Sequence, residues 1–344
     1  MTESRTATDE SVTLPEFVRS LPKAELHLHV EGTLEPELLV RLAERNDVDL
    51  PWSSVDEVRS AYDFVDLQSF LDVYYAGMAV LRTPDDYAEL MTAYLDRAVA
   101  DGVVRAEIFF DPQAHVERGV GFPGFMEGFR AAMADARRVH GITSELVLCV
   151  LRHLSGEDAL ATVEAAEPHL DGVVAIGLDS AEVDNPPERF VDAFARAREL
   201  GLRAVAHAGE EGPPSFITGA LDELGAERID HGVRCLEDTD LVARLRRDRV
   251  PLTVCPLSNV ALRVVDTLAD HPLPRLLAED LVVTINSDDP SYFGGYVGDN
   301  LVAVAETFDL DRDVLVELAA NSITASFLED DVKQIHLADL DARP

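Results

Sequence analysis

Eight short runs of apolar and β-branched residues recur along this chain, and segments of helix length separate most of them. The runs cover residues 24–29, 104–110, 145–151, 173–178, 203–207, 228–231, 251–255 and 281–286. Intervening segments such as 190–200, 217–224 and 241–247 carry apolar residues at helical spacing and stop near a glycine or a polar turn. Eight strands that alternate with helices predict a closed parallel (β/α)8 barrel of the TIM type rather than an open sheet.

One interval is much longer than the others, and it follows the first run. Residues 34–101 have the pattern of several helices, so we expect a helical insertion after the first strand. This insertion carries the aromatic side chains Tyr62, Phe64, Phe70, Tyr74 and Tyr75. Two interpretations stay open: the rings wall or cover a site at the mouth of the barrel, or they pack in the core.

The 344-residue sequence contains no internal repeat, linker or low-complexity tract, so we expect one barrel domain over residues 14–344. Residues 1–13 are polar, and we expect this N-terminal segment to be disordered. It lacks the apolar run of a signal peptide, and no stretch of about 18 apolar residues occurs elsewhere in the sequence. We therefore expect a cytoplasmic protein.

The charge balance is strongly acidic, with 65 acidic and 29 basic residues and a formal net charge of −36. This charge would repel phosphate backbones and anionic lipid headgroups, which argues against nucleic-acid and membrane partners. Cys149, Cys235 and Cys255 are far apart in sequence, which argues against a disulfide framework or a thiolate metal site. We expect a small-molecule partner, and both a monomer and a homo-oligomer remain open.

Titratable residues gather at the ends of four predicted strands. His27 and His29 are two residues apart, which points both imidazoles to the same side of an extended chain. This spacing alone would fit two structural histidines equally well. The fifth strand ends with His207 and Glu210, the sixth with His231, and the eighth with Asp288 and Asp289. Barrel enzymes collect their catalytic residues at the carboxyl ends of the strands, so the set predicts an active site.

Three neutral imidazoles and one carboxylate suit Zn²⁺ or a similar divalent ion. We assign one such ion per chain to His27, His29, His207 and Asp288. A bound ion of this kind lowers the pKa of water towards neutrality, so hydrolysis is the expected reaction class. Glu210 and His231 remain available, and we assign Glu210 as the proton donor and His231 as the base that orients or deprotonates water.

With these residues in place, the chain resembles the adenosine/adenine deaminase family of the amidohydrolase superfamily over nearly its whole length. The matching stretches, in order, are PKAELHLH at 22–29, HAGE at 207–210, RIDHG at 228–232, CPLSN at 255–259 and NSDDP at 286–290. The resemblance implies a Zn²⁺-dependent hydrolase that removes the 6-amino group of a purine. It further implies that Glu210 protonates the ring nitrogen N1, that His231 assists the attacking water and that Asp289 hydrogen-bonds to N7.

Two positions resemble the adenine deaminase branch of that family. Glu31 stands where nucleoside deaminases typically carry Asp, and its longer side chain would crowd a ribose. Ser180 stands where they carry a glycine whose backbone approaches the purine N3. We therefore expect Glu31, Ser180 and Asp289 to bind the substrate. The expected reaction converts adenine to hypoxanthine and ammonia, a step of purine salvage.

Other interpretations stay open at this stage. A deaminase of an N9-substituted adenine, such as adenosine or aminodeoxyfutalosine, would share these motifs. A metal-dependent purine-binding barrel without activity would keep the ligands, although the presence of Glu210 and His231 argues against it. A binuclear, dihydroorotase-like hydrolase needs a modified lysine on the fourth strand, which this sequence lacks. The base-flipping zinc deaminases combine His-x-Glu with Cys-x-x-Cys, and only the first half is present, at 115–117.

Overall fold

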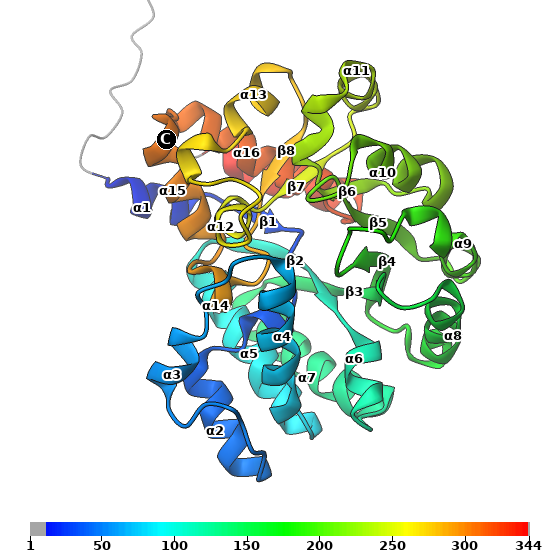
Figure 1. Cartoon of the computed structure of the whole chain (residues 1–344). Coiled ribbons are helices and arrows are strands. Elements are labelled where there is room, and N and C mark those ends of the chain that lie inside the picture. Colours follow the sequence, from blue (N-terminus) through cyan, green and yellow to red (C-terminus); the bar gives the residue numbers. More distant parts are fainter. Residues whose placement is uncertain (1–11, 343–344) are drawn as a thin grey trace, which may run out of the picture.

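Eight parallel strands form the centre of the molecule, in the order β1 to β8 (Figure 1). The computed structural model describes residues 12–342. The strands are β1 Lys23–Glu25, β2 Val103–Phe110, β3 Thr143–Leu151, β4 Val173–Asp179, β5 Arg203–Ala208, β6 Arg228–His231, β7 Leu252–Val254 and β8 Val283–Ile285. Each strand pairs with the next one in sequence, and the sheet closes almost completely, as expected for a (β/α)8 barrel. The predicted fold is confirmed.

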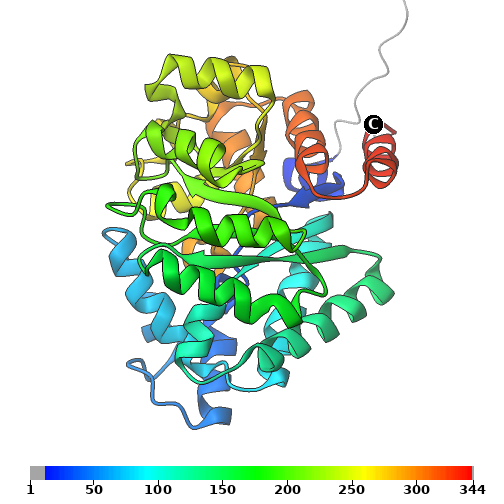
Figure 2. The same cartoon turned by 90° about the vertical axis from the view of Figure 1, so that its right-hand side faces the viewer.

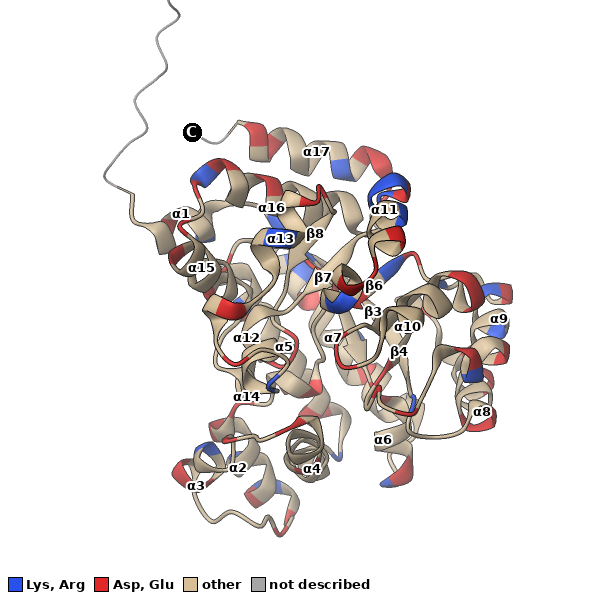
Figure 3. Ribbon diagram, turned by 45° about the horizontal axis from the view of Figure 1, so that its top comes forward, with Lys and Arg blue, Asp and Glu red and all other residues tan. Residues whose placement is uncertain are grey.

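Helices surround the barrel, and Figure 2 shows several of them stacked along its flank. They are α1 Leu14–Ser20, α2 Pro36–Asn46, α3 Val55–Ser60, α4 Leu67–Gly77, α5 Pro84–Ala100, α6 Pro112–Glu117, α7 Phe122–His140, α8 Gly156–Ala166, α9 Val191–Glu199, α10 Pro214–Gly219, α11 Thr239–Asp248, α12 Pro256–Ala261, α13 Leu273–Ala278, α14 Pro290–Phe293, α15 Val297–Phe308, α16 Arg312–Ala325 and α17 Asp330–Asp341. Acidic positions occur on helices as far apart as α3, α9 and α17 in Figure 3, so the negative charge is spread over the outer ring.

The first strand is shorter than the sequence predicts. β1 ends at Glu25, and His27 and His29 follow it in an extended segment. This segment bonds to both neighbours in turn, because His29 N donates to Asp288 O at 3.0 Å and Val30 N donates to Phe109 O at 2.9 Å. The barrel is therefore closed between its last and first strands by one bridge, Leu28 with Asp288, rather than by a regular ladder.

The long interval after β1 holds α2, α3, α4 and α5, as the predicted helical insertion requires. Its aromatic side chains divide between the two roles that the sequence leaves open. Phe70, Tyr74 and Tyr75 of α4 line the pocket at the barrel mouth. Tyr62 and Phe64 instead pack in an aromatic cluster behind that wall.

Residues 1–11 of the N-terminal segment expected to be disordered lie outside the described residues. Thr13 caps α1 with a capping box to Glu16, and Arg312 Nη2 donates to Val12 O at 2.8 Å. Cys149, Cys235 and Cys255 are buried and not paired with one another. Between residues 12 and 342, no helix is long and apolar enough to cross a membrane.

Candidate active site

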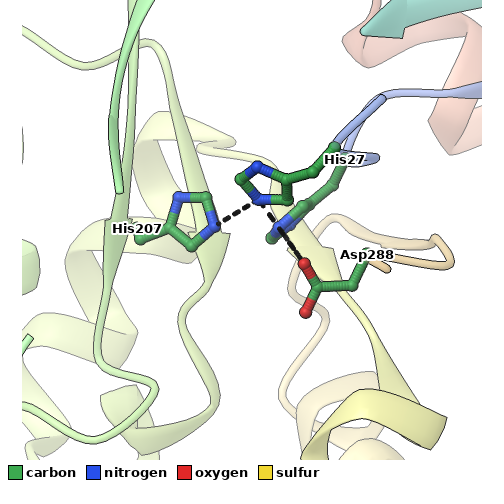
Figure 4. Close-up of side chains that lie close together, drawn as sticks. His27, His207 and Asp288 are labelled. Carbon is green, nitrogen blue, oxygen red and sulfur yellow. Dashed lines mark hydrogen bonds and ion pairs between the residues drawn. The ribbon is translucent and has the colours of Figure 1, made fainter. Parts of the chain in front are cut away.

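Four predicted metal ligands meet beyond the carboxyl ends of the strands, and Figure 4 labels three of them, His27, His207 and Asp288. One ligand atom from each of His27, His29, His207 and Asp288 lies within 4.8 Å of all the others, and all four residues are buried. The Nε2 atoms of His29 and His207 are 3.3 Å apart, and His27 Nε2 lies 3.3 Å from Asp288 Oδ1. The side chains therefore converge on one point from β1, β5 and β8.

In two of the three imidazoles, those of His27 and His207, a hydrogen bond holds the outer nitrogen. His207 Nδ1 lies 3.0 Å from the carbonyl oxygen of Leu178, and His27 Nδ1 lies 3.1 Å from that of Thr253. A carbonyl can only accept, so both rings carry their proton on Nδ1 and turn a free Nε2 lone pair inwards. His27 Nε2 is buried without a hydrogen-bond partner. Convergent lone pairs with anchored outer nitrogens are the arrangement of a metal site.

Glu210 and His231 lie beside this cluster. His231 Nε2 is 3.5 Å from Glu210 Oε2 and 3.8 Å from Asp288 Oδ2. Burial, with a further contribution from the charge of Asp288, holds the pKa of Glu210 well above its usual value, so its carboxyl keeps a proton. Burial and the neighbouring His27 lower the pKa of His231 to about 3. A neutral imidazole and a protonated acid thus face the same pocket.

The pocket lining includes two of the three predicted substrate-binding residues. Asp289 and Ser180 line it, together with Asp111, Asp179 and the rings of α4. Glu31 does not line it, contrary to the expectation that its side chain would bind the substrate and crowd a ribose. Its carboxylate is 1% exposed and accepts hydrogen bonds from His115 Nε2 at 2.7 Å and from the backbone N–H of Asp111 at 3.2 Å. Those two donors hold the longer side chain behind the pocket wall.

Comparison with known proteins shows to which family this barrel belongs. The family model described as adenosine deaminase matches residues 22–342. The chain belongs to the adenosine deaminase family. An adenine deaminase of Streptomyces coelicolor is 58% identical over 324 residues, which cover 94% of this chain and 95% of that protein. An adenine deaminase of Rhodospirillum rubrum is 56% identical over 313 residues, which cover 91% of this chain and 94% of that protein.

Two solved structures are similar to this chain over nearly its whole length. The crystal structure of an adenine deaminase from Arthrobacter aurescens matches with a TM-score of 0.92 and 52% identity, covering 93% of this chain and 98% of that one. An amidohydrolase from Burkholderia ambifaria, solved with bound Zn, matches with a TM-score of 0.87 and 28% identity. That match covers 97% of this chain and 95% of the other.

In this member of the adenosine deaminase family, a chain of hydrogen bonds sets the tautomer of His231. The backbone N–H of Leu273 donates to His271 Nδ1 at 3.0 Å, so neutral His271 carries its proton on Nε2. His271 Nε2 lies 3.1 Å from Asn259 Oδ1, and Asn259 Nδ2 lies 3.4 Å from His231 Nδ1. His231 Nδ1 is therefore an acceptor, and Nε2 presents its hydrogen to Glu210 and Asp288.

The sequence analysis missed Glu182, which fixes the loop that carries the acid. Its carboxylate is 1% exposed and accepts four backbone N–H groups, those of residues 209–212, at 2.7–3.1 Å. Four hydrogen bonds to one buried carboxylate hold the main chain around Glu210 in place. The motif HAGE contains no signal for this partner, because Glu182 comes from the loop after β4.

Asp111 and Asp179 were also missed, although the rule applied to the other strands would have found them. Asp179 ends β4 and Asp111 directly follows β2, so both occupy the carboxyl ends of strands. Each is 2% exposed, lines the pocket and has one carboxylate oxygen, Oδ1, without a hydrogen-bond partner.

Three residues of the site adopt left-handed backbone conformations that non-glycine residues rarely occupy. The φ angles are +73° at Ser180, +62° at His231 and +62° at Asp288. Each such conformation costs on the order of 1–3 kcal/mol and persists only where surrounding contacts impose it. The carboxyl-end loops therefore carry strain at the positions that face the pocket.

Proposed function

We propose that this protein hydrolyses adenine to hypoxanthine and ammonia, with one Zn²⁺ per chain. The observation that carries the proposal is the position of Glu210, a buried acid whose Oε2 lies 3.5 Å from His231 Nε2 in the pocket that His29, His207 and Asp288 of the ligand cluster line. Hydrolytic removal of a ring amino group needs such a proton donor next to the nucleophile. The adenine deaminases that match over more than nine-tenths of the chain support adenine as the substrate.

The ligand cluster fits a divalent zinc ion. His27, His29 and His207 supply imidazole nitrogens and Asp288 supplies a carboxylate oxygen, the donor types that Zn²⁺ prefers. The unpartnered Nε2 of His27 and the close approach of His29 to His207 are both relieved by a cation between them. When bound, the ion would lower the pKa of water and so supply a nucleophile at neutral pH.

The remaining groups act on the purine and on the water molecule. Glu210 gives its proton to N1, which draws electrons from C6 and prepares it for attack. His231 donates its Nε2 hydrogen and so orients the attacking oxygen, and the Asp288 carboxylate, whose Oδ2 lies 3.8 Å from that Nε2, accepts one proton of the water and passes it to the departing amino group. The second proton of the water restores Glu210 when the C6 carbonyl forms. Because Asn259 sets the tautomer of His231, the neutral ring donates a hydrogen bond to the water instead of acting as the base that the sequence predicts. Asp289 binds N7, and the backbone at Ser180 binds N3.

The test is to assay adenine and adenosine with one metal-analysed preparation, following ammonia release. We expect kcat/KM for adenine to exceed that for adenosine by roughly a hundredfold or more, because the relatives that match over more than nine-tenths of this chain are adenine deaminases. His207→Ala should lose both metal and activity. Faster turnover of adenosine would overturn the substrate, and an active enzyme without any transition metal would overturn the metal site.

A further inference from the structure

One carboxylate in the pocket has no role in the reaction as proposed above. Asp111 follows β2 directly and lines the pocket, with 2% of its surface exposed. Tyr74 Oη donates to its Oδ2 at 3.4 Å, and its carboxyl group also contacts the carboxyl group of Asp179, which lines the same pocket. Two adjacent acids hold fewer protons than they have oxygens, so Asp111 keeps an oxygen that can accept a hydrogen bond from a ligand.

A relay of side chains holds Asp111 in this position. Arg118 Nη2 lies 3.0 Å from His115 Nδ1, and because arginine can only donate, His115 carries its own proton on Nε2. That Nε2–H donates to Glu31 Oε1 at 2.7 Å, and the same oxygen accepts the backbone N–H of Asp111 at 3.2 Å. Glu31 therefore anchors the main chain at Asp111 from behind the pocket wall.

The order of groups around the barrel mouth matches the order of atoms around a purine. Glu210 follows β5, Ser180 follows β4, Asp111 follows β2 and Asp289 follows β8, and these strands succeed one another around the barrel. Around the edge of adenine the nitrogens occur in the order N1, N3, N9, N7. Since the proposed function places Glu210 at N1, Ser180 at N3 and Asp289 at N7, the position left for Asp111 is N9.

We propose that Asp111 accepts a hydrogen bond from the N9–H of adenine and thereby selects the free base over N9-substituted purines. This inference rests on the proposed function and names the residue that gives it its specificity. Free adenine carries a hydrogen at N9, whereas a nucleoside carries a carbon there. An N9-substituted purine would leave Asp111 Oδ1 buried without a donor and would press the substituent against it. Sites that pair a ligand N–H in this way discriminate strongly against analogues that lack it.

The experiment compares adenine with 9-methyladenine, the smallest N9-substituted analogue, in three proteins. We expect Asp111→Ala to lower kcat/KM for adenine by on the order of a hundredfold, while kcat/KM for 9-methyladenine stays equal or rises, because the acceptor is lost and space is gained. Asp111→Asn keeps one acceptor oxygen and should retain an intermediate preference. Asp184→Asn, an exposed acid on a loop away from the pocket lining, is the matched control and should keep the wild-type ratio.

Binding of the products gives a second readout that does not depend on turnover. Calorimetry with hypoxanthine and 9-methylhypoxanthine should show the same loss of preference in Asp111→Ala. If the wild-type protein deaminates adenine but Asp111→Ala keeps its preference for adenine over 9-methyladenine, the role of Asp111 is refuted and the proposed function stands. If the wild-type protein neither binds nor deaminates adenine, the proposed function itself fails, and this inference fails with it.

Discussion

Charged side chains are buried at both ends of the barrel, and the two sets are partnered differently. Towards the amino ends of the strands, Glu107 pairs with Arg228 and Arg105 and also accepts the backbone N–H of Phe327 at 2.6 Å. Burial opposes the ionised form, but Arg228 and Arg105 outweigh it and hold the pKa of Glu107 below its usual value. Opposite charges meet at this end, although Nε and Nη2 of Arg228 make no hydrogen bond, and the network links β2, β6 and the segment after α16.

At the mouth, acids outnumber cations. Four of the acids there each keep a buried carboxylate oxygen without a partner, namely Asp111, Asp179, Glu210 and Asp289. Such an arrangement is costly for folding and makes sense as a site that a metal and a substrate complete. The charged network at the amino end thus stabilises the fold, whereas the unpartnered acids at the mouth destabilise it and stay available to bind a metal and a substrate.

The largest effect should follow from breaking the paired end. Glu107→Gln leaves Arg228 buried without a counter-charge, so we expect the free energy of unfolding to fall by about 3–5 kcal/mol. Because the pKa of Glu107 is lowered by folding, its contribution is present above the unfolded pKa near 4.5 and is lost as pH falls below it. Denaturant unfolding at pH 7 and at pH 4 measures both effects.

Glu145→Gln is the matched control for that prediction. Glu145 pairs with Arg105, but its side chain is 38% exposed, and such pairs contribute about 0–1 kcal/mol. Equal losses from the two variants would show that burial does not distinguish these ion pairs, and the contrast between the two ends would lose its basis.

Removing Glu210, the acid at the mouth, should lower activity but not stability, which is the opposite of the result expected for Glu107→Gln. We expect Glu210→Gln to lower kcat by on the order of a hundredfold or more, with metal content unchanged, because the proton donor is lost. Stability should not fall. Since burial raises the pKa of Glu210, the folded state loses stability as pH rises from about 4.5 towards that raised pKa, and the variant lacks this loss.

Glu211→Gln serves as the neighbouring control, because Glu211 does not line the pocket. It should keep a kcat close to that of the wild type. A Glu210→Gln protein with normal kcat would remove Glu210 from the mechanism, and one that is strongly destabilised would place it with the structural charges instead.

A smaller effect should follow from reversing the tautomer of His231. In Asn259→Asp, the carboxylate would accept from His231 Nδ1, and Nε2 would lose its hydrogen towards the pocket. We expect kcat to fall by on the order of tenfold, less than the hundredfold or more that a general acid or base contributes, because only the orientation of the water changes. Nitrogen NMR of the ring should report the change of tautomer, and an unchanged tautomer would refute the relay through His271.

Alternation and strand-end polarity are local patterns, so the sequence predicts the barrel and the polar residues that cluster at the carboxyl ends of its strands. The same patterns place β6 at its observed bounds and miss those of β1, since the segment with His27 and His29 bonds to two neighbours in turn instead of forming a ladder. Glu31 could not be oriented from its neighbours, because the donor that holds it, His115, lies 84 residues away. The same holds for Glu182, whose hydrogen bonds reach the loop after β5.

The smallest expected effect concerns backbone strain, which also separates the mouth from the paired end. Ser180 adopts a φ of +73°, which costs an ordinary residue roughly 1–2 kcal/mol and costs glycine nothing. Glycine also makes the unfolded chain more flexible, which opposes the gain by about 0.5–1 kcal/mol. We therefore expect Ser180→Gly to raise the free energy of unfolding by about 0.5 kcal/mol.

His153→Ala is the control for this prediction. It removes the hydrogen-bond partner of Ser180 Oγ, which lies 2.8 Å away, but leaves the backbone strained. It should therefore not raise stability. A gain in both variants would assign the effect to the side-chain contact, and a loss in Ser180→Gly would show that the mouth is not strained at this position.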